Sequence, residues 1–169
     1  MAQEGKSVAT ESGGFADYSP VQFQAALSAS GLNAAGLAQE LQVTPAAVNR
    51  YANLRSGLQP ATVKRMCDAL GIHPSVVCAV PLESALLVHL RCWSGLTRTQ
   101  AAQGMQLAGA LYGVWEGRGD MSHERENGQK SFIHRSDWEM CRLAAKVFSC
   151  QVRQVTAALQ RTRDATPWG

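Results

Sequence analysis

The stretch from Thr44 to Arg55 reads Thr-Pro-Ala-Ala-Val-Asn-Arg-Tyr-Ala-Asn-Leu-Arg. Thr44 is a favourable helix N-cap, because its hydroxyl can accept a hydrogen bond from a backbone N–H of the first turn. Pro45 suits the first helical position, where no backbone N–H is needed. The apolar residues of one predicted helix face recur at helical spacing and are Ala47, Val48 and Tyr51. The opposite face is predicted to be exposed and consists of Pro45, Ala46, Asn49 and Arg50.

A second short helix is predicted immediately upstream, from Asn33 to Leu41. Only Gln42 and Val43 separate it from the Thr44 cap. Two short helices joined by so tight a turn are typical of a helix-turn-helix, whose second helix can enter the major groove of DNA. Spacing alone leaves a second interpretation open, namely an ordinary helical hairpin in a small helical domain.

Composition is compatible with a DNA partner but does not demand one. The chain has 169 residues, of which 46% are hydrophobic and 17% charged, and its formal net charge is +3. These values predict a packed core and exclude a strongly basic, histone-like coating of DNA.

We expect a cytoplasmic protein with no membrane partner. Glu4, Lys6 and Glu11 interrupt the place where a signal peptide would need an apolar core. No run approaches the ~18 apolar residues of a membrane span. The five cysteines are odd in number and lack a Cys-x-x-Cys pair, which favours buried free thiols over disulfides.

Residues 1–18 show no periodicity and are predicted to be a disordered tail. Structure is expected to begin with the capping box that Ser19 and Gln22 can form around Pro20. The first helix is expected to stop near Gly31, and a fourth helix is expected after Pro60. With a short fifth helix from His73-Pro74, residues 19–80 form a predicted domain of five short helices.

The segment from Gly31 to Tyr51, together with Met66-Cys67-Asp68-Ala69-Leu70-Gly71-Ile72, resembles the lambda-repressor-like (Cro-type, XRE) helix-turn-helix family. One departure from the family pattern lies after the recognition helix. The family often has Glu followed by Gly there, whereas this chain has Ala52 and Leu54, with Gly57 slightly late.

The second half of the chain repeats features of the first. Ser30-Gly31-Leu32 recurs at an offset of 64 as Ser94-Gly95-Leu96, and Trp115-Glu116-Gly117 resembles the family's aromatic-Glu-Gly ending. Later positions match at an offset of 78, as in Leu70 and Phe148. Residues 81–163 are therefore predicted to be a second, divergent helix-turn-helix domain, and the fold class to be all-α with two tandem domains. Chance similarity in an Ala- and Gln-rich chain is the alternative.

The change of offset places an insertion within residues 118–134. This stretch is polar, and two interpretations of it stay open. It is a disordered surface loop, or it is a basic loop that touches the DNA backbone through Arg118, Arg125 or Lys130.

The resemblance places Pro45, Ala46, Asn49 and Arg50 at groove-facing positions. Arg50 is the strongest candidate, because a guanidinium can bond O6 and N7 of guanine together. Asn49 can pair similarly with adenine, and Ala46 can rest on a thymine methyl group. The candidates for phosphate contacts in this half are Asn33, Ala34, Thr44, Asn53 and Arg55.

The second recognition helix is predicted to be chemically different. Gly113 stands in the place of Asn49 and Val114 in that of Arg50, and Gly109 lies one turn earlier. Three interpretations remain: close approach to DNA, an apolar contact with a second subunit or another protein, or a degenerate structural copy. Thr97 and Arg98 are further candidates for phosphate contacts.

The sequence predicts a transcription regulator that binds double-stranded DNA, more specifically a repressor that occupies an operator. A homodimer is compatible with this function. The alternatives are an activator or adaptor whose second domain binds RNA polymerase or another protein, an antitoxin-like inhibitor, and a protein-only module. No enzymatic activity, cofactor or metal is expected, since the histidines and cysteines lack metal-ligand spacing and no phosphate-binding loop is present.

Overall fold

The computed structural model describes residues 14–54, 57–124 and 128–166. Most of these residues are helical, as the all-α prediction requires. The first half contains α1 (Pro20–Ala29), α2 (Ala34–Leu41), α3 (Pro45–Tyr51), α4 (Pro60–Leu70) and the 3-10 helix η1 (Pro74–Val77). A short 3-10 helix, η2 (Leu82–Ser84), connects it to the second half. There the helices are α5 (Leu87–Trp93), α6 (Arg98–Gly104), α7 (Gly109–Arg118), α8 (Asp137–Val147) and α9 (Val152–Ala165).

Local capping explains where several of these helices begin. Ser19, Asn33 and Thr44 each accept a hydrogen bond from a first-turn N–H, and Pro20 and Pro45 occupy the first turns of α1 and α3. In the second half, side chains form reciprocal capping boxes at the starts of α6 and α8, where the N-caps are Thr97 and Ser136.

The backbone of the second half follows that of the first at the predicted offsets. Gly31 and Gly95 have φ angles of +74° and +77°, and Gln42 and Gln106 have φ angles of +56° and +55°. At the later offset of 78, Gly71 and Ser149 are both left-handed. Left-handed residues are uncommon outside glycine, so their recurrence at corresponding places is a geometric repeat.

The same side-chain positions are buried in both halves. Phe23, Leu37 and Val48 are fully buried in the first half, and so are their counterparts in the second half, Leu87, Ala101 and Tyr112. Met66 and Val77 correspond in the same way to Ala144 and Val155 at the later offset. Each half thus builds its core from the same helix faces.

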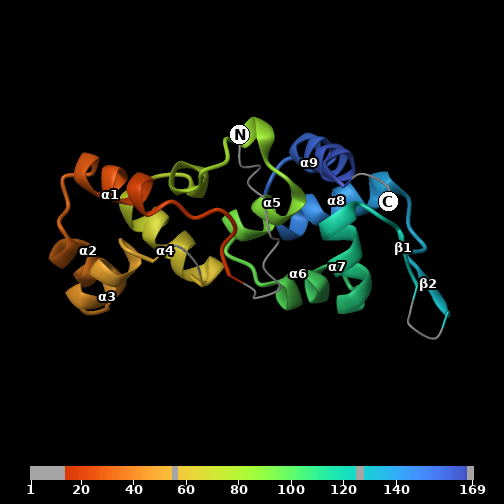
Figure 1. Cartoon of the computed structure of the whole chain (residues 1–169), viewed down its shortest axis with the longest axis horizontal. Helices are drawn as coiled ribbons and strands as arrows, with labels where there is room; N and C mark the ends of the chain where they lie inside the picture. Colours follow the sequence, from red (N-terminus) through yellow and green to blue (C-terminus); the bar gives the residue numbers. More distant parts are fainter. Residues whose placement is uncertain (1–13, 55–56, 125–127, 167–169) are drawn as a thin grey trace, which may run out of the picture.

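The prediction that residues 1–18 form a disordered tail is wrong for residues 14–18, which are ordered. Phe15 and Tyr18 are buried, and the Phe15 N–H donates to the carbonyl of Leu58 over 2.6 Å. Asp17 lies 2.8 Å from Nε2 of His89 on α5. This segment therefore contacts both halves, which pack against each other where α4 meets α5 (Figure 1).

The connection between α7 and α8 is not the structureless loop that the polar composition suggested. Strands β1 (Ser122–Glu124) and β2 (Lys130–Phe132) form an antiparallel hairpin in which Ser122 pairs with Phe132. Arg118 is the last residue of α7. Arg125 lies outside the described residues.

Two arginines of α9 make hydrogen bonds to other elements of the second half. Arg163 donates to both oxygens of Asp137 and to the carbonyl of Gly119. Arg161 donates to the carbonyl of Ala85 over 2.8 Å. These bonds tie α9 to the ends of neighbouring elements.

The five cysteines are free, as expected. Four of them are buried, and Cys150 is half-buried. Burial raises the pKa of Cys67 to about 12, with a further contribution from Asp68, so this thiol is protonated at neutral pH.

Candidate nucleic-acid interface

The turn between α2 and α3 is held by backbone and side-chain hydrogen bonds. Gln42 adopts the left-handed conformation that ends α2, and the Val43 N–H donates to the Ala38 carbonyl over 2.9 Å. The Thr44 hydroxyl then accepts from the Ala47 N–H over 3.2 Å and starts α3. The two helices therefore meet with the tight connection that the sequence predicted.

The outward face of α3 carries the predicted groove-facing residues. Pro45, Ala46, Asn49 and Arg50 are all exposed, whereas Val48 on the opposite face is fully buried. The Arg50 guanidinium lies 5.8 Å from the centre of the Tyr51 ring. Within the described part of the chain Arg50 has no carboxylate partner. Its donors are therefore available to an acceptor outside the protein.

The candidates for phosphate contacts in this half have different local roles. Asn33 is exposed, and its Oδ1 accepts from the Gly36 N–H over 2.8 Å, so it caps α2. Ala34, the first residue of α2, is half-buried. The Asn53 amide donates to the Asn49 carbonyl over 2.7 Å. Arg55 lies outside the described residues. Their contacts with DNA stay predictions.

Residues that the sequence did not single out fix the far end of α3. The Tyr18 hydroxyl donates to the Tyr51 carbonyl over 3.0 Å, and the Gln24 amide donates to the Ala52 carbonyl over 2.8 Å. Burial raises the pKa of Tyr18, so this hydroxyl remains a donor at neutral pH. These bonds satisfy carbonyls at the C-terminus of α3, where the helix itself supplies no partner.

The corresponding surface of α7 carries glycines and small apolar side chains. Gly109 and Gly117 are exposed and Gly113 is half-buried. A Cβ atom placed on any of these three glycines would meet nothing within 4 Å. Ala108, the N-cap of α7, makes no side-chain capping bond. This face therefore offers few groups that could distinguish one base pair from another.

Arg98 is only partly available for a phosphate. Its Nε lies 3.2 Å from Oε2 of Glu116, a side chain that is almost fully buried. Glu116 also accepts from Arg91 and from the Tyr112 hydroxyl. Burial opposes the charge of Arg91, but the carboxylate outweighs it and the pKa of Arg91 is raised overall. A phosphate contact by Arg98 would compete with Glu116, while Thr97 caps α6.

Figure 1 shows α3 and the α6–α7 pair along one edge of the molecule, with α1 and α9 towards the opposite edge. In this view α3 and the α6–α7 pair thus lie on the same side of the molecule. Among the described residues no helix combines the length and apolar character that a membrane span needs, and no group of three or more metal-ligand side chains is present.

Residues 24–77 match the family model described as helix-turn-helix, and the match is of the Cro/C1 (XRE) type. This segment is therefore similar to the helix-turn-helix of that family, which suggests a DNA-binding transcription regulator. The match ends at Val77 and does not include the second half. Searches of characterised proteins and of solved structures returned no match to the chain.

Proposed function

We propose that the protein is a sequence-specific repressor that occupies an operator with α3 in the major groove. The observation that carries this proposal is the exposed pair Asn49 and Arg50, which lie on a proline-started helix inside the family-matched segment. Both side chains can make paired hydrogen bonds to a purine. An operator occupied in this way is closed to other proteins.

The test begins with DNA selected from a random pool by the full-length chain. Arg50→Ala should weaken binding to the selected DNA by about 1–3 kcal/mol, because one bidentate base contact is lost. Arg153→Ala is the matched control, since Arg153 is an exposed arginine on α9. Thermal melts should show that both variants fold. Equal affinity of the Arg50 variant and the wild type would refute the role of α3.

We also propose that residues 81–163 form a second, divergent copy of the domain. The recurrence of left-handed residues and of buried positions supports it. A single domain of this kind buries modest area on DNA, and a second domain on the same chain adds affinity through effective concentration. Because α7 presents Gly113 and Val114 where α3 presents Asn49 and Arg50, the second copy contacts DNA without strong base preference.

A footprint on the selected DNA separates this proposal from the adaptor function. Protection that extends beyond the bases recognised by α3 on one side is expected if the second half lies on the duplex. The bare, uncharged face of α7 equally suits a protein partner such as RNA polymerase. A footprint limited to one half-site, together with retention of the polymerase on the DNA, would favour that second function.

A further inference from the structure

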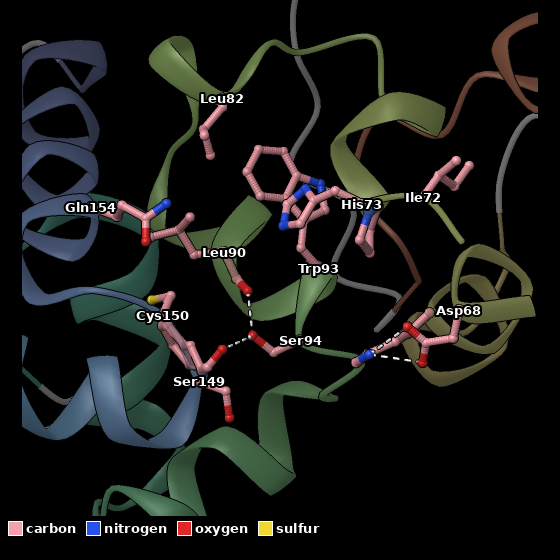
Figure 2. Close-up of a pocket in the computed structure, with 13 residues that line it drawn as sticks. Asp68, Ile72, His73, Leu82, Leu90, Trp93, Ser94, Ser149, Cys150 and Gln154 are labelled. Carbon is pink, nitrogen blue, oxygen red and sulfur yellow. Dashed lines mark hydrogen bonds and ion pairs between the residues drawn. The ribbon is translucent and has the colours of Figure 1, made fainter. Parts of the chain in front are cut away.

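A pocket of about 290 Å³ lies between the two halves. The first half contributes α4 and the turn after it, and the second half contributes α5 and the start of α9. Figure 2 shows Trp93 between His73 on one side and Gln154 on the other. The pocket therefore depends on the way the halves are packed, and its volume is at the lower end of the range for small-molecule sites.

The pocket combines apolar walls with polar groups. Leu90 and Trp93 are buried, while Leu82 is exposed at the rim. The Trp93 ring meets the His73 ring edge-on, with centroids 5.5 Å apart. Such walls suit the apolar body of a small ring compound.

Besides the buried, unpartnered indole N–H of Trp93, two hydrogen-bond donors remain at the sides of the pocket. Nδ1 of His73 accepts from the Ser75 N–H over 3.2 Å, so the neutral ring carries its proton on Nε2. Burial and the neighbouring Lys64 lower the pKa of His73, which keeps the ring neutral at pH 7. Oε1 of Gln154 accepts from the Gln151 N–H over 2.9 Å, which leaves its NH2 group to donate. Neither donor has a bonded acceptor among the described residues.

The charged groups of the pocket neutralise each other. Nζ of Lys64 lies 2.9 and 2.8 Å from the two carboxylate oxygens of Asp68. The stem of Lys64 rests against Gly95, where an added Cβ would lie only 3.1 Å from Lys64 Cδ. Gly95 has a φ of +77°, so the turn needs glycine for its backbone as well as for this contact. The lining thus holds donors and apolar surface without an unbalanced charge.

We propose that this pocket binds a small, uncharged carbonyl compound. Its apolar body packs on Trp93 and Leu90, and its acceptor atoms face Gln154 and His73. A carboxylic acid fits less well, because its negative charge would be repelled by Asp68, which also lines the pocket and already holds Lys64 as its counter-ion. Nothing in this site requires DNA, so it can be tested whether or not the proposed repressor function holds.

The experiment is an NMR titration of the full chain with benzamide, benzoate and toluene. Benzamide should bind with a Kd on the order of 1 mM and shift the indole N–H signal of Trp93. Benzoate, which is charged, and toluene, which lacks an acceptor, should each bind at least ~3-fold more weakly. Benzoate or toluene binding as tightly as benzamide would overturn the assigned class, and shifts remote from Trp93 would overturn the site.

Gln154→Glu supplies the matched variant, because the new carboxylate still accepts the Gln151 N–H but no longer donates. Benzamide binding should weaken at least ~5-fold. Gln160→Glu adds the same charge to an exposed position of α9 and should leave the affinity unchanged. Equal binding by both variants contradicts the donor role of Gln154. The chemical shifts of the wild type keep the site testable if the Gln154 variant does not fold.

Discussion

The two halves of the molecule have left-handed and buried residues at corresponding positions, but they differ in their core side chains and in their exposed helix faces. In the second half a buried carboxylate, Glu116, collects hydrogen bonds from Arg91, Arg98 and Tyr112. The corresponding positions of the first half are apolar, namely Leu27, Ala34, Val48 and Ala52. The same helix arrangement is therefore compatible with an apolar core and with a polar one.

The turns at Gly31 and Gly95 show how the halves are joined. Both glycines are left-handed, but a Cβ on Gly31 would meet nothing within 4 Å, whereas Gly95 is covered by Lys64. The turn at Gly95 is thus packed against the first half, whereas the corresponding turn at Gly31 is open. Such a contact joins unlike faces of two similar units. Lys64 also lines the pocket between the two halves.

The largest effect that separates the two cores is expected from Glu116→Ala. Arg91 would remain buried without a counter-charge, and the free energy of unfolding should fall by about 3–5 kcal/mol. Urea denaturation measures the change. Glu40→Ala, at an exposed position of α2, is the control and should change stability by less than ~0.5 kcal/mol. A loss below ~1 kcal/mol for Glu116→Ala would show that the network contributes little.

Converting the network to apolar residues, as in the first half, sharpens the same comparison. Arg91→Leu, Tyr112→Phe and Glu116→Ala together remove the buried charges and the hydroxyl at once. The triple variant should be more stable than Glu116→Ala alone, because no uncompensated charge is left. A triple variant less stable than the single one would mean that the second half cannot accept an apolar core.

The sequence predicts those parts of the structure that depend on local chemistry. N-caps such as Asn33, Thr44 and Ser136 act within one helical turn, so the starts of α2, α3 and α8 are readable from spacing. The exposed face of α3 follows from the same periodicity. The sequence also predicts the left-handed turns at Gly31 and Gly95, because such turns restrict which residues fit.

Features set by distant contacts are not readable in this way. Tyr18 is ordered by contacts with Tyr51 and Cys78, both far along the chain, and no local pattern announces this. Gln24 likewise supports the end of α3 from α1. The hairpin after α7 has three-residue strands, too short for a clear alternation. Long-range pairing decides each case.

The glycines of α7 and its C-cap give the next effect in size. Gly119→Ala should destabilise the protein by about 1–3 kcal/mol, because its φ is +73° and a Cβ would lie 2.5 Å from Cγ of Arg163. Gly113→Ala should stabilise it by about 1 kcal/mol, since the position is helical and the space is open. Thermal melts of both variants measure the signs. If both variants changed stability in the same direction, Gly113 and Gly119 would not differ in their structural roles as proposed.

The smallest effect concerns the ion pair between Arg163 and Asp137. The counterpart of Asp137 at the offset of 78 is Gln59, which carries no charge. Hydrogen bonding to Arg163 lowers the pKa of Asp137 below its usual value. A carboxyl group whose folded pKa is depressed stabilises the fold above its unfolded pKa of about 3.9 and loses that contribution as the pH falls through the folded value. Because both side chains are partly exposed, the contribution at pH 7 should be at most ~1 kcal/mol after screening. Melting temperatures of the wild type and Asp137→Asn should therefore differ at pH 7 and converge towards pH 3, whereas a difference that persists unchanged at pH 3 would assign the loss to packing and not to charge.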